Sequence, residues 1–485
     1  MNPTDLNAAE LSEAIHGREF SCREVMSSYL DQIDRRNPIL NAIVSLRDRS
    51  ELLAEAERAD HELASGESRG WMHGLPHAVK DLAETKGLRT TMGSPLHTDY
   101  IPRFDALHVA RIRAAGAIII GKTNVPEFGL GSNTFNPVFG ATANPYDPSR
   151  VAGGSSGGAA VALATRMVPV ADGSDYMGSL RNPAGWCNVV GFRPSQGRVP
   201  SFPVTDAYTG QCATDGPMGR RVLDVALLLG TQAGWDRRSP LSVSGRLDEF
   251  IGVQNARRAL DGDLHGVRIG WLGDLDGYLA TEPGILETCE LALARMSDAG
   301  ATVVPASLRF DHERLWEAWT LWRHATVAAR HGESLSDERT ASQLKPEVRW
   351  EAERGMSMSA IDLKRSAITR SEFFTAITRM MNTESKDDGV DLLALPTTQV
   401  WPFSINERWP KRIGDREMDT YHRWMECTIH ATFAGLPAVS MPAGFDPNGL
   451  PAGIQLIGGP LADQGVLRAA SAYERTITDL AVGAA

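Results

Sequence analysis

A glycine-rich stretch that encloses two serines constrains this chain more than any other feature of its sequence. Residues 153–158 read GGSSGG, with Ser155 and Ser156 at the centre, and a third serine, Ser179, ends a second run of turn residues, GSDYMGS. Glycine loses more backbone entropy on folding than any other residue, so this cluster would be costly in an ordinary surface loop. The pattern therefore indicates a backbone that turns sharply, or closely approaches another group, beside these serines.

Short apolar runs alternate with helical patterns around this stretch and again near the C-terminus. The predicted strands are HAVKDL, AIIIGK and MVPVADG at 77–82, 117–122 and 167–173, followed by runs at 266–272, 301–308, 390–398, 437–444 and 453–458. DALHVARIRAAG at 105–116 and GAAVALATR at 158–166 have the periodicity of helices between strands. This alternation is typical of an α/β fold.

The remaining segments predict helices without a clear domain boundary. SCREVMSSYLDQIDRR begins with a capping box, Ser21 at the N-cap and Glu24 three residues later, within an N-terminal helical region at 1–70. A charged region at 311–386 lacks strand patterns and predicts a helical insertion. No internal repeat and no linker rich in Pro, Gly or Ser divides the 485 residues, so we expect one large domain over 1–485.

Composition argues against several classes of function. The net charge of −11 disfavours a nucleic-acid partner, since phosphate backbones bind basic surfaces. The five cysteines are dispersed, and Pro76 between His73 and His77 prevents the helical spacing of a metal site, so we expect no metal. The N-terminus carries Asp5 and Glu10 instead of an apolar signal-peptide core, and no apolar run approaches the roughly 20 residues of a membrane helix. We expect a cytoplasmic protein without a membrane partner.

Two short motifs match known patterns, but their surroundings do not fit. GAIIIGKT at 116–123 satisfies the P-loop pattern G-x-x-x-x-G-K-[ST], yet its three isoleucines predict a buried strand instead of a phosphate-binding loop. GGSSG and GSSGG satisfy G-x-S-x-G, the nucleophile elbow of α/β-hydrolases, which must directly follow a strand. The preceding ANPYDPSRVA contains two prolines and turn residues instead. We therefore predict neither an ATP site nor such an elbow.

Lys80 offers a different way to activate a serine. A serine hydroxyl is a weak nucleophile that needs an adjacent base, and a lysine can be that base when burial lowers the pKa of its ammonium group. Lys80 lies at the end of the apolar run GLPHAVKD, where its charge would be desolvated. A lysine at a strand end also commonly extends to solvent. The residues alone leave both possibilities open.

Six segments form a combined pattern: GLPHAVKD, GGSSGG, GSDYMGSLR, GFRPSQGRVP, TDGPMGRRVLDVALLL and FAGLPAVSMPAGFDPNGLPAGIQLIG. They extend over nearly the whole chain, and together they resemble the amidase signature family. The resemblance implies an α/β fold in which helices cover both faces of a large central mixed β-sheet. It also implies that the chain hydrolyses carbon–nitrogen bonds.

The resemblance assigns a catalytic triad: Ser179 would be the nucleophile, Ser155 would relay protons beside a cis peptide bond, and Lys80 would be the base. It also implies an oxyanion hole, in which backbone N–H groups stabilise the charge that develops on the attacked carbonyl oxygen. The implied donors are the N–H groups of Tyr176, Met177, Gly178 and Ser179. Asp175 and Arg181 flank this loop, and we expect them to form an ion pair that supports it.

The chain departs from the family pattern at two places. The nucleophile loop reads Met-Gly-Ser at 177–179 where the family usually has Gly-Gly-Ser, and Arg-Pro-Ser at 193–195 replaces the usual Lys-Pro-Thr. Met177 would place a flexible apolar side chain beside the scissile carbonyl. This variant looks most like bacterial members that hydrolyse aryl amides, oligoamides or carbamates.

An aromatic run in the insertion, RLWEAWTLWRH, places Trp316 and Trp319 three residues apart on one face of the predicted helix. These residues can simply pack the insertion onto the core. The alternative is that the insertion forms a wall of the substrate entrance, where Met177, Trp316 and Trp319 would form an apolar pocket.

The sequence therefore predicts an amidase, a serine hydrolase that forms an acyl-enzyme on Ser179 and needs no cofactor. Its partner would be a small-molecule amide or carbamate, and the chain would be a monomer or a homodimer. Two alternatives stay open. One is the amidase-like subunit of a glutamine-dependent amidotransferase, which would pass ammonia to a partner, and the other is an inactive binding protein on the same scaffold.

Overall fold

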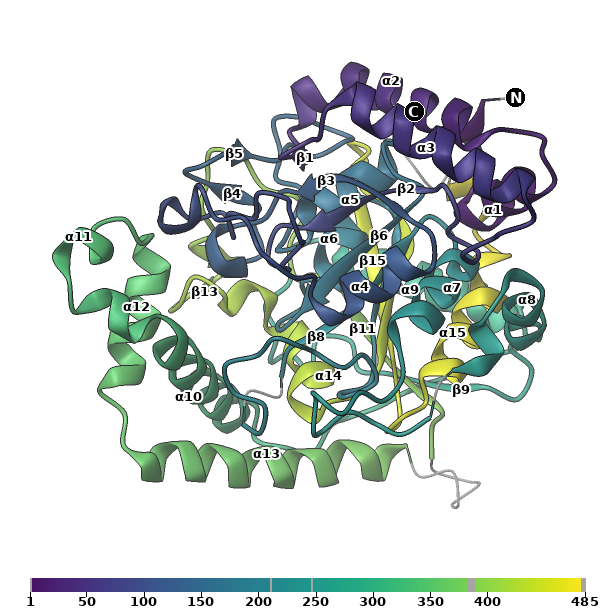
Figure 1. The fold of residues 1–485 in the computed structure, drawn as a ribbon. Helices are drawn as coiled ribbons and strands as arrows, with labels where there is room; N and C mark the ends of the chain where they lie inside the picture. Colours follow the sequence, from purple (N-terminus) through teal and green to yellow (C-terminus); the bar gives the residue numbers. More distant parts are fainter. Residues whose placement is uncertain (1, 210–211, 246, 382–388, 481–485) are drawn as a thin grey trace.

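A mixed eight-stranded sheet forms the centre of the computed structural model, which describes residues 2–209, 212–245, 247–381 and 389–480 (Figure 1). The strand order is β10-β9-β11-β15-β14-β7-β8-β6. β9 pairs in parallel with β10 and β11, and the remaining pairs are antiparallel. The strands are β6 (Val170–Asp175), β7 (Val190–Arg193), β8 (Thr214–Gly219), β9 (Arg268–Trp271), β10 (Thr302–Pro305), β11 (Leu392–Pro396), β14 (Ala438–Phe445) and β15 (Pro451–Gly458).

Helices cover both faces of this sheet, as expected. Side chains alternate between the faces of a strand, and accordingly Leu392 and Ala394 of β11 belong to one buried cluster, whereas Leu393 and Leu395 belong to another. The first cluster includes residues of α7 (Val222–Gln232), α8 (Val253–Leu260), α9 (Ile285–Asp298) and α15 (Asp463–Glu474). The second includes residues of α6 (Arg181–Trp186), α10 (His312–His331), α13 (Ala360–Met380) and α14 (Ile429–Ala434).

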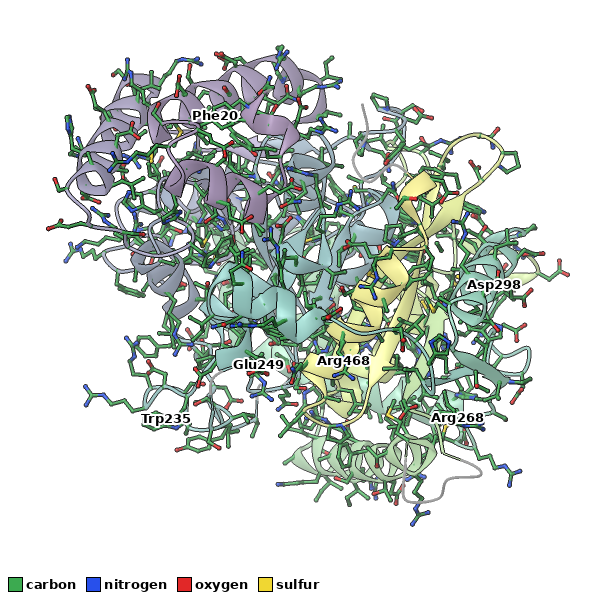
Figure 2. All side chains as sticks on the ribbon, turned by 90° about the vertical axis from the view of Figure 1, so that its right-hand side faces the viewer. Phe20, Trp235, Glu249, Arg268, Asp298 and Arg468 are labelled. Atoms are coloured by element: carbon green, nitrogen blue, oxygen red, sulfur yellow. The ribbon has the colours of Figure 1, made fainter. Side chains whose placement is uncertain are left out.

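Two of the predicted strands belong to a separate, three-stranded sheet with the order β1-β3-β2. β2 (Pro76–Lys80) runs parallel to β3 (Ile118–Thr123), and the short β1 (Ile43–Val44) is antiparallel to β3. All residues of β3 are buried, so the GAIIIGKT segment is a core strand and not a phosphate-binding loop. The N-terminal helices α1 (Ala8–His16), α2 (Cys22–Leu40) and α3 (Arg49–Ala64) lie at this end of the molecule, where Figure 2 labels Phe20.

Helix α5 (Gly157–Ala164) lies between the two sheets. It contacts β1, β2 and β3 of the small sheet and β6 and β8 of the large one, and all of its residues are buried. A helix that is apolar on every side is typical of one enclosed by protein. Because the GGSSGG stretch leads directly into α5, its serines lie where the two sheets meet.

Residues 312–380 of the insertion form mainly helices, and positions 382–386 lie outside the described residues. α10 packs against α12 (Pro346–Met356) and α13, and the short α11 (Glu338–Ala341) lies at the outer end of this arm (Figure 1). Other elements are α4 (Leu107–Ala114) and the two-residue strands β4 (Phe135–Asn136), β5 (Gly140–Ala141), β12 (Arg412–Ile413) and β13 (Arg416–Glu417). Within the described ranges, no helix combines the length and apolarity needed to cross a membrane.

Candidate active site

Lys80, the last residue of β2, points into the protein among three serines. Its Nζ lies 2.9 Å from Ser155 Oγ, 2.7 Å from Ser156 Oγ and 3.0 Å from Ser174 Oγ. Only 2% of this lysine is exposed. Burial lowers the pKa of Lys80 to about 7, although three nearby carboxylates oppose the change. Near neutral pH, Lys80 is therefore an uncharged amine in a large fraction of the molecules, and this amine can accept a proton.

Ser155 and Ser179 line one cavity beside this lysine. The peptide bond between Gly154 and Ser155 is cis. The cavity is open to solvent. The Ser156 N–H donates to the Ser179 carbonyl at 3.2 Å, which holds the loop of Ser179 against the start of α5. Within the described residues, the Ser179 hydroxyl has no hydrogen-bond partner, so it is free to meet a substrate.

The glycines of the two serine-containing stretches meet specific steric requirements. A Cβ at Gly158 would lie 2.3 Å from the backbone nitrogen of Asn124 and 2.6 Å from the carbonyl oxygen of Ala42, too close for any side chain. Gly178 has a φ of +81°, which L-residues rarely adopt, and a Cβ there would lie 2.6 Å from Thr428. The glycines therefore allow α5 to approach its neighbours closely and allow the loop before Ser179 to turn.

The expected ion pair between Asp175 and Arg181 is present beneath this loop. Arg181 donates from Nε and Nη2 to the two carboxylate oxygens at 3.0 and 3.1 Å, and neither side chain is exposed. Arg193 donates to the Asp175 carbonyl at 2.6 Å. Burial alone would raise the pKa of Asp175, but Arg181 and Arg193 hold it well below its usual range. The carboxylate thus stays ionised and anchors both arginines.

One of the four proposed oxyanion donors already has an acceptor, the carboxylate of Asp175. The Gly178 N–H donates to Asp175 Oδ1 at 2.9 Å, so it is not available to a substrate oxygen. The N–H groups of Tyr176, Met177 and Ser179 have no acceptor among the described residues. Three of the four N–H groups therefore remain as candidates for the oxyanion hole.

Met177 and the two tryptophans of the insertion belong to one buried cluster, but only Met177 lines the cavity. Met177 lines the cavity and does not have a positive φ, so its side chain is compatible with this position. Trp316 and Trp319 are 3% and 0% exposed and are not part of the cavity lining. Trp319 packs behind Tyr176, with ring centroids 5.2 Å apart. The insertion instead lines the cavity with the C-terminal half of α10, through Arg323, Thr326, Val327, Arg330 and His331.

Sequence reasoning missed Ser156 and Ser174 as contacts of Lys80. Ser156 follows the proposed relay serine directly, and Ser174 lies two residues after Asp172 on β6, so these two β6 side chains share one face of the strand. The sequence shows this period of two. It does not show that this face of β6 meets the end of β2.

Comparison with known proteins identifies the family of this chain. A family model described as Amidase matches residues 24–467. A glutamyl-tRNA(Gln) amidotransferase subunit from Thermosynechococcus vestitus is 34% identical, over 96% of this chain and 97% of its own. A bacterial aryl acylamidase of the amidase signature family matches with a TM-score of 0.88 and 30% identity, covering 97% of this chain and 96% of the other. The corresponding amidotransferase subunit from Thermotoga maritima matches with a TM-score of 0.76 and 27% identity, covering 98% and 95%. The chain therefore belongs to the amidase signature family.

Proposed function

We propose that the protein hydrolyses carbon–nitrogen bonds of small amides through an acyl-enzyme on Ser179. The observation that carries this proposal is the contact of Lys80 Nζ with Ser155 Oγ at 2.9 Å, in a cavity that Ser155 shares with Ser179. As Ser179 Oγ attacks the carbonyl carbon, its proton passes to Ser155, whose own proton passes to the amine of Lys80. The proton returns to the leaving nitrogen as the C–N bond breaks, and water then hydrolyses the ester.

Backbone N–H groups would stabilise the charge on the attacked oxygen. Those of Tyr176, Met177 and Ser179 are available for this task, and each donor in such a site is worth about 3 kcal/mol of transition-state stabilisation. The ion pair beneath the loop supports the proposal because it restrains the backbone that carries these donors. The proposed mechanism uses only groups of this chain and water.

The lining of the cavity suits an apolar acyl group. Many of the lining residues are apolar, among them Leu82, Phe128, Met177 and Met425, and burial lowers the pKa of His331 to about 4, so its ring is neutral. The charged side chains of the described lining are two arginines, with no aspartate or glutamate among them. The α-ammonium group of glutamine would thus meet no carboxylate there, which is unfavourable for a buried charge.

A second candidate function is that of the amidase-like component in a glutamine-dependent amidotransferase. The names of the curated relatives favour it, since the relative from Thermosynechococcus vestitus is 34% identical over nearly the full length. In that case the chain would assemble with partner proteins and pass ammonia to them. The TM-score is higher to the aryl acylamidase than to the amidotransferase subunit from Thermotoga maritima, 0.88 against 0.76, which supports hydrolysis of other amides instead.

A substrate panel on the purified chain separates the two functions. We expect anilides and uncharged amides to be hydrolysed and glutamine and asparagine to remain intact. The value of kcat/KM should rise with the apolar size of the acyl group, because each buried methylene contributes about 0.8 kcal/mol. Carbamates and esters in the same panel define the leaving-group preference. If glutamine were the only amide cleaved, or if cleavage required added partner proteins, the amidotransferase function would replace the proposal.

Met177 should limit the size of the accepted acyl group. Met177→Gly is expected to shift the preference toward larger acyl groups without abolishing turnover, because it removes an apolar side chain from the cavity wall. The measurement is kcat/KM across the same series. Trp316→Phe is the control, since Trp316 is buried outside the cavity lining and its replacement should leave the size preference unchanged. An identical preference in Met177→Gly and wild type would assign Met177 to packing alone.

The protonation of Lys80 predicts a pH profile. Only the uncharged amine accepts a proton, and burial lowers its pKa to about 7, so kcat/KM should be low in acid, rise through about pH 7 and level off above it. The rate of Ser179 labelling by a fluorophosphonate should follow the same curve, since both report the free enzyme. A rate that falls from neutral to alkaline pH while circular dichroism shows a folded protein would contradict the role of Lys80.

A further inference from the structure

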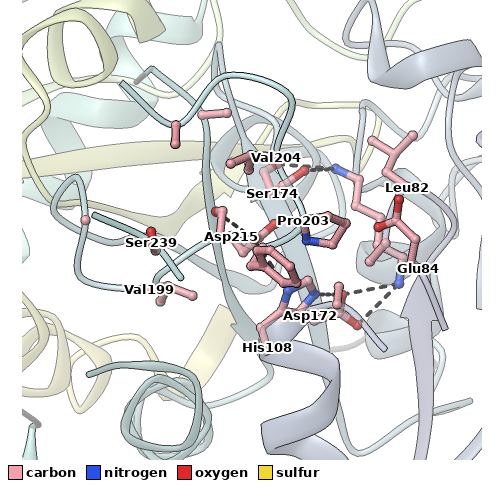
Figure 3. Close-up of a pocket in the computed structure, with 18 of the residues that line it drawn as sticks. Leu82, Glu84, His108, Asp172, Ser174, Val199, Pro203, Val204, Asp215 and Ser239 are labelled. Carbon is pink, nitrogen blue, oxygen red and sulfur yellow. Dashed lines mark hydrogen bonds and ion pairs between the residues drawn. The ribbon is translucent and has the colours of Figure 1, made fainter. Parts of the chain in front are cut away.

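A second cavity reaches Lys80 and differs in character from the one that contains Ser179. Figure 3 shows it between β2, β6 and the loops that carry Val199, Pro203 and Ser239. Ser155 and Ser179 are absent from its described lining, whereas Lys80 is part of it. Its acidic lining residues are Glu84, Asp172, Asp206 and Asp215. The two cavities adjoin, since Leu82, Ser174, Ala213 and Arg330 line both, and Lys80 lines the acidic one.

A row of buried acidic and imidazole side chains connects Lys80 to this second cavity. The Lys80 backbone N–H donates to both carboxylate oxygens of Asp172 at 3.3 Å. Asp172 Oδ1 lies 3.0 Å from His77 Nε2, and Oδ2 lies 3.5 Å from His108 Nε2. His108 Nδ1 lies 3.4 Å from Asp215 Oδ2, and the Asp215 side chain, 22% exposed, reaches the cavity. The dashed lines of Figure 3 trace part of this row.

The charges of this row are mutually dependent. Burial would raise the pKa of Asp172, but the nearby imidazole of His108 and the hydrogen-bonded imidazole of His77 hold it well below its usual range. Burial would lower the pKa of His108, yet Asp215 and Asp172 raise it above its ordinary value. The row thus favours a cationic imidazole between two carboxylates. These charges lie beside Lys80, the side chain that must gain and lose a proton in each catalytic cycle.

Other charged groups also face the row, among them Glu84, which interacts with His108, and Lys122, which interacts with Asp172. Lys80 also faces Asp175, whose charge is balanced by its two arginines. His108 also faces Lys122 of β3, which opposes its protonation. Lys122 Nζ itself donates to the Ala83 carbonyl at 2.6 Å. Asp172 is the largest electrostatic influence that favours the ammonium form of Lys80, and among the described residues it has no balancing arginine.

We propose that Asp172 is a positioning residue for Lys80, and that His77 and His108 set how strongly Asp172 holds the lysine in its charged form. Asp172 orients the end of β2 through the Lys80 N–H, and its negative charge counteracts burial, which favours the neutral amine. A base that also returns its proton to the leaving nitrogen needs both forms to be accessible. The inference rests on the proposed role of Lys80 as the base.

Two substitutions should move the pH profile in opposite directions. Asp172→Asn removes a negative charge near Lys80, so the acid limb of the profile should move to lower pH by about one unit. His108→Gln removes a positive charge that offsets two carboxylates, so the limb should move to higher pH. The probe is the pH dependence of the rate at which a fluorophosphonate labels Ser179, which requires no knowledge of the natural substrate.

Asp224→Asn is the matched control, because Asp224 is a buried carboxylate on α7 that accepts from the Ala9 N–H at 2.9 Å, outside this row. It should lower Tm without moving the limb. If the acid limbs of Asp172→Asn and His108→Gln both coincided with the acid limb of wild type, the inference would be overturned. If Asp172→Asn does not fold, His108→Gln decides alone, and a limb at or below the wild-type position would refute the proposal. A wild-type enzyme without any acid limb would instead refute the role of Lys80, which distinguishes the two failures.

Discussion

Ser179→Ala is expected to lower kcat by at least about a thousandfold while the protein stays folded. The hydroxyl is the proposed nucleophile, and within the described residues it makes no hydrogen bond, so its removal takes away the acyl acceptor but no stabilising contact. The measurements are kcat on the best substrate of the panel, Tm, and mass spectrometry of the protein after fluorophosphonate treatment. Wild type should carry one adduct on Ser179, and the variant should carry none.

A buried serine outside the cavity provides the control. Ser366 of α13 donates to the Ala318 carbonyl at 2.6 Å and does not line the cavity, so Ser366→Ala should keep both activity and labelling. An adduct on Ser155 or Ser156 in wild type would move the nucleophile to that position. Near-normal turnover by Ser179→Ala would exclude an acyl-enzyme at Ser179.

Lys80→Met should be almost as damaging as Ser179→Ala. Methionine keeps the length and apolar character of the buried stem but cannot accept a proton, so Ser155 loses the group that takes up its hydrogen. Residues of a triad act as a unit, and the double variant Ser179→Ala with Lys80→Met should therefore be no slower than Ser179→Ala alone. The comparison is made on the alkaline plateau of the pH profile, where wild-type Lys80 is fully deprotonated.

Lys122 offers a matched control on the neighbouring strand. It is fully buried, and burial lowers its pKa to about 8, but its Nζ contacts the Ala83 carbonyl and, at 2.7 Å, Thr85 Oγ1 instead of the catalytic serines. Lys122→Met should lower Tm because it leaves these acceptors unsatisfied, while kcat of the folded fraction on the alkaline plateau stays close to wild type. Rates in Lys80→Met that match those in Lys122→Met would mean that another group is the base.

Local sequence patterns were sufficient to predict most of the helices and strands. The capping box at Ser21 and Glu24 is present, with the Glu24 N–H donating to Ser21 Oγ at 3.1 Å, because this motif depends only on residues within one turn. The predicted apolar runs form strands because their patterns are also local. Resemblance, and not periodicity, supplied Ser155, Ser179 and Lys80. β7 and β8 were missed because their glycine and proline content is atypical of strands.

The sequence by itself determined which backbone can exist around the serines, since only glycine tolerates the close contacts at Gly158 and the left-handed turn at Gly178. Tertiary structure decided what surrounds them. The tryptophans of α10 are buried because that helix packs between other elements, and the row behind Lys80 exists because His77, His108 and Asp172, far apart in the chain, come together where β2, α4 and β6 meet. Electrostatic interactions act through space and require burial to be strong, so no local pattern along the chain encodes them.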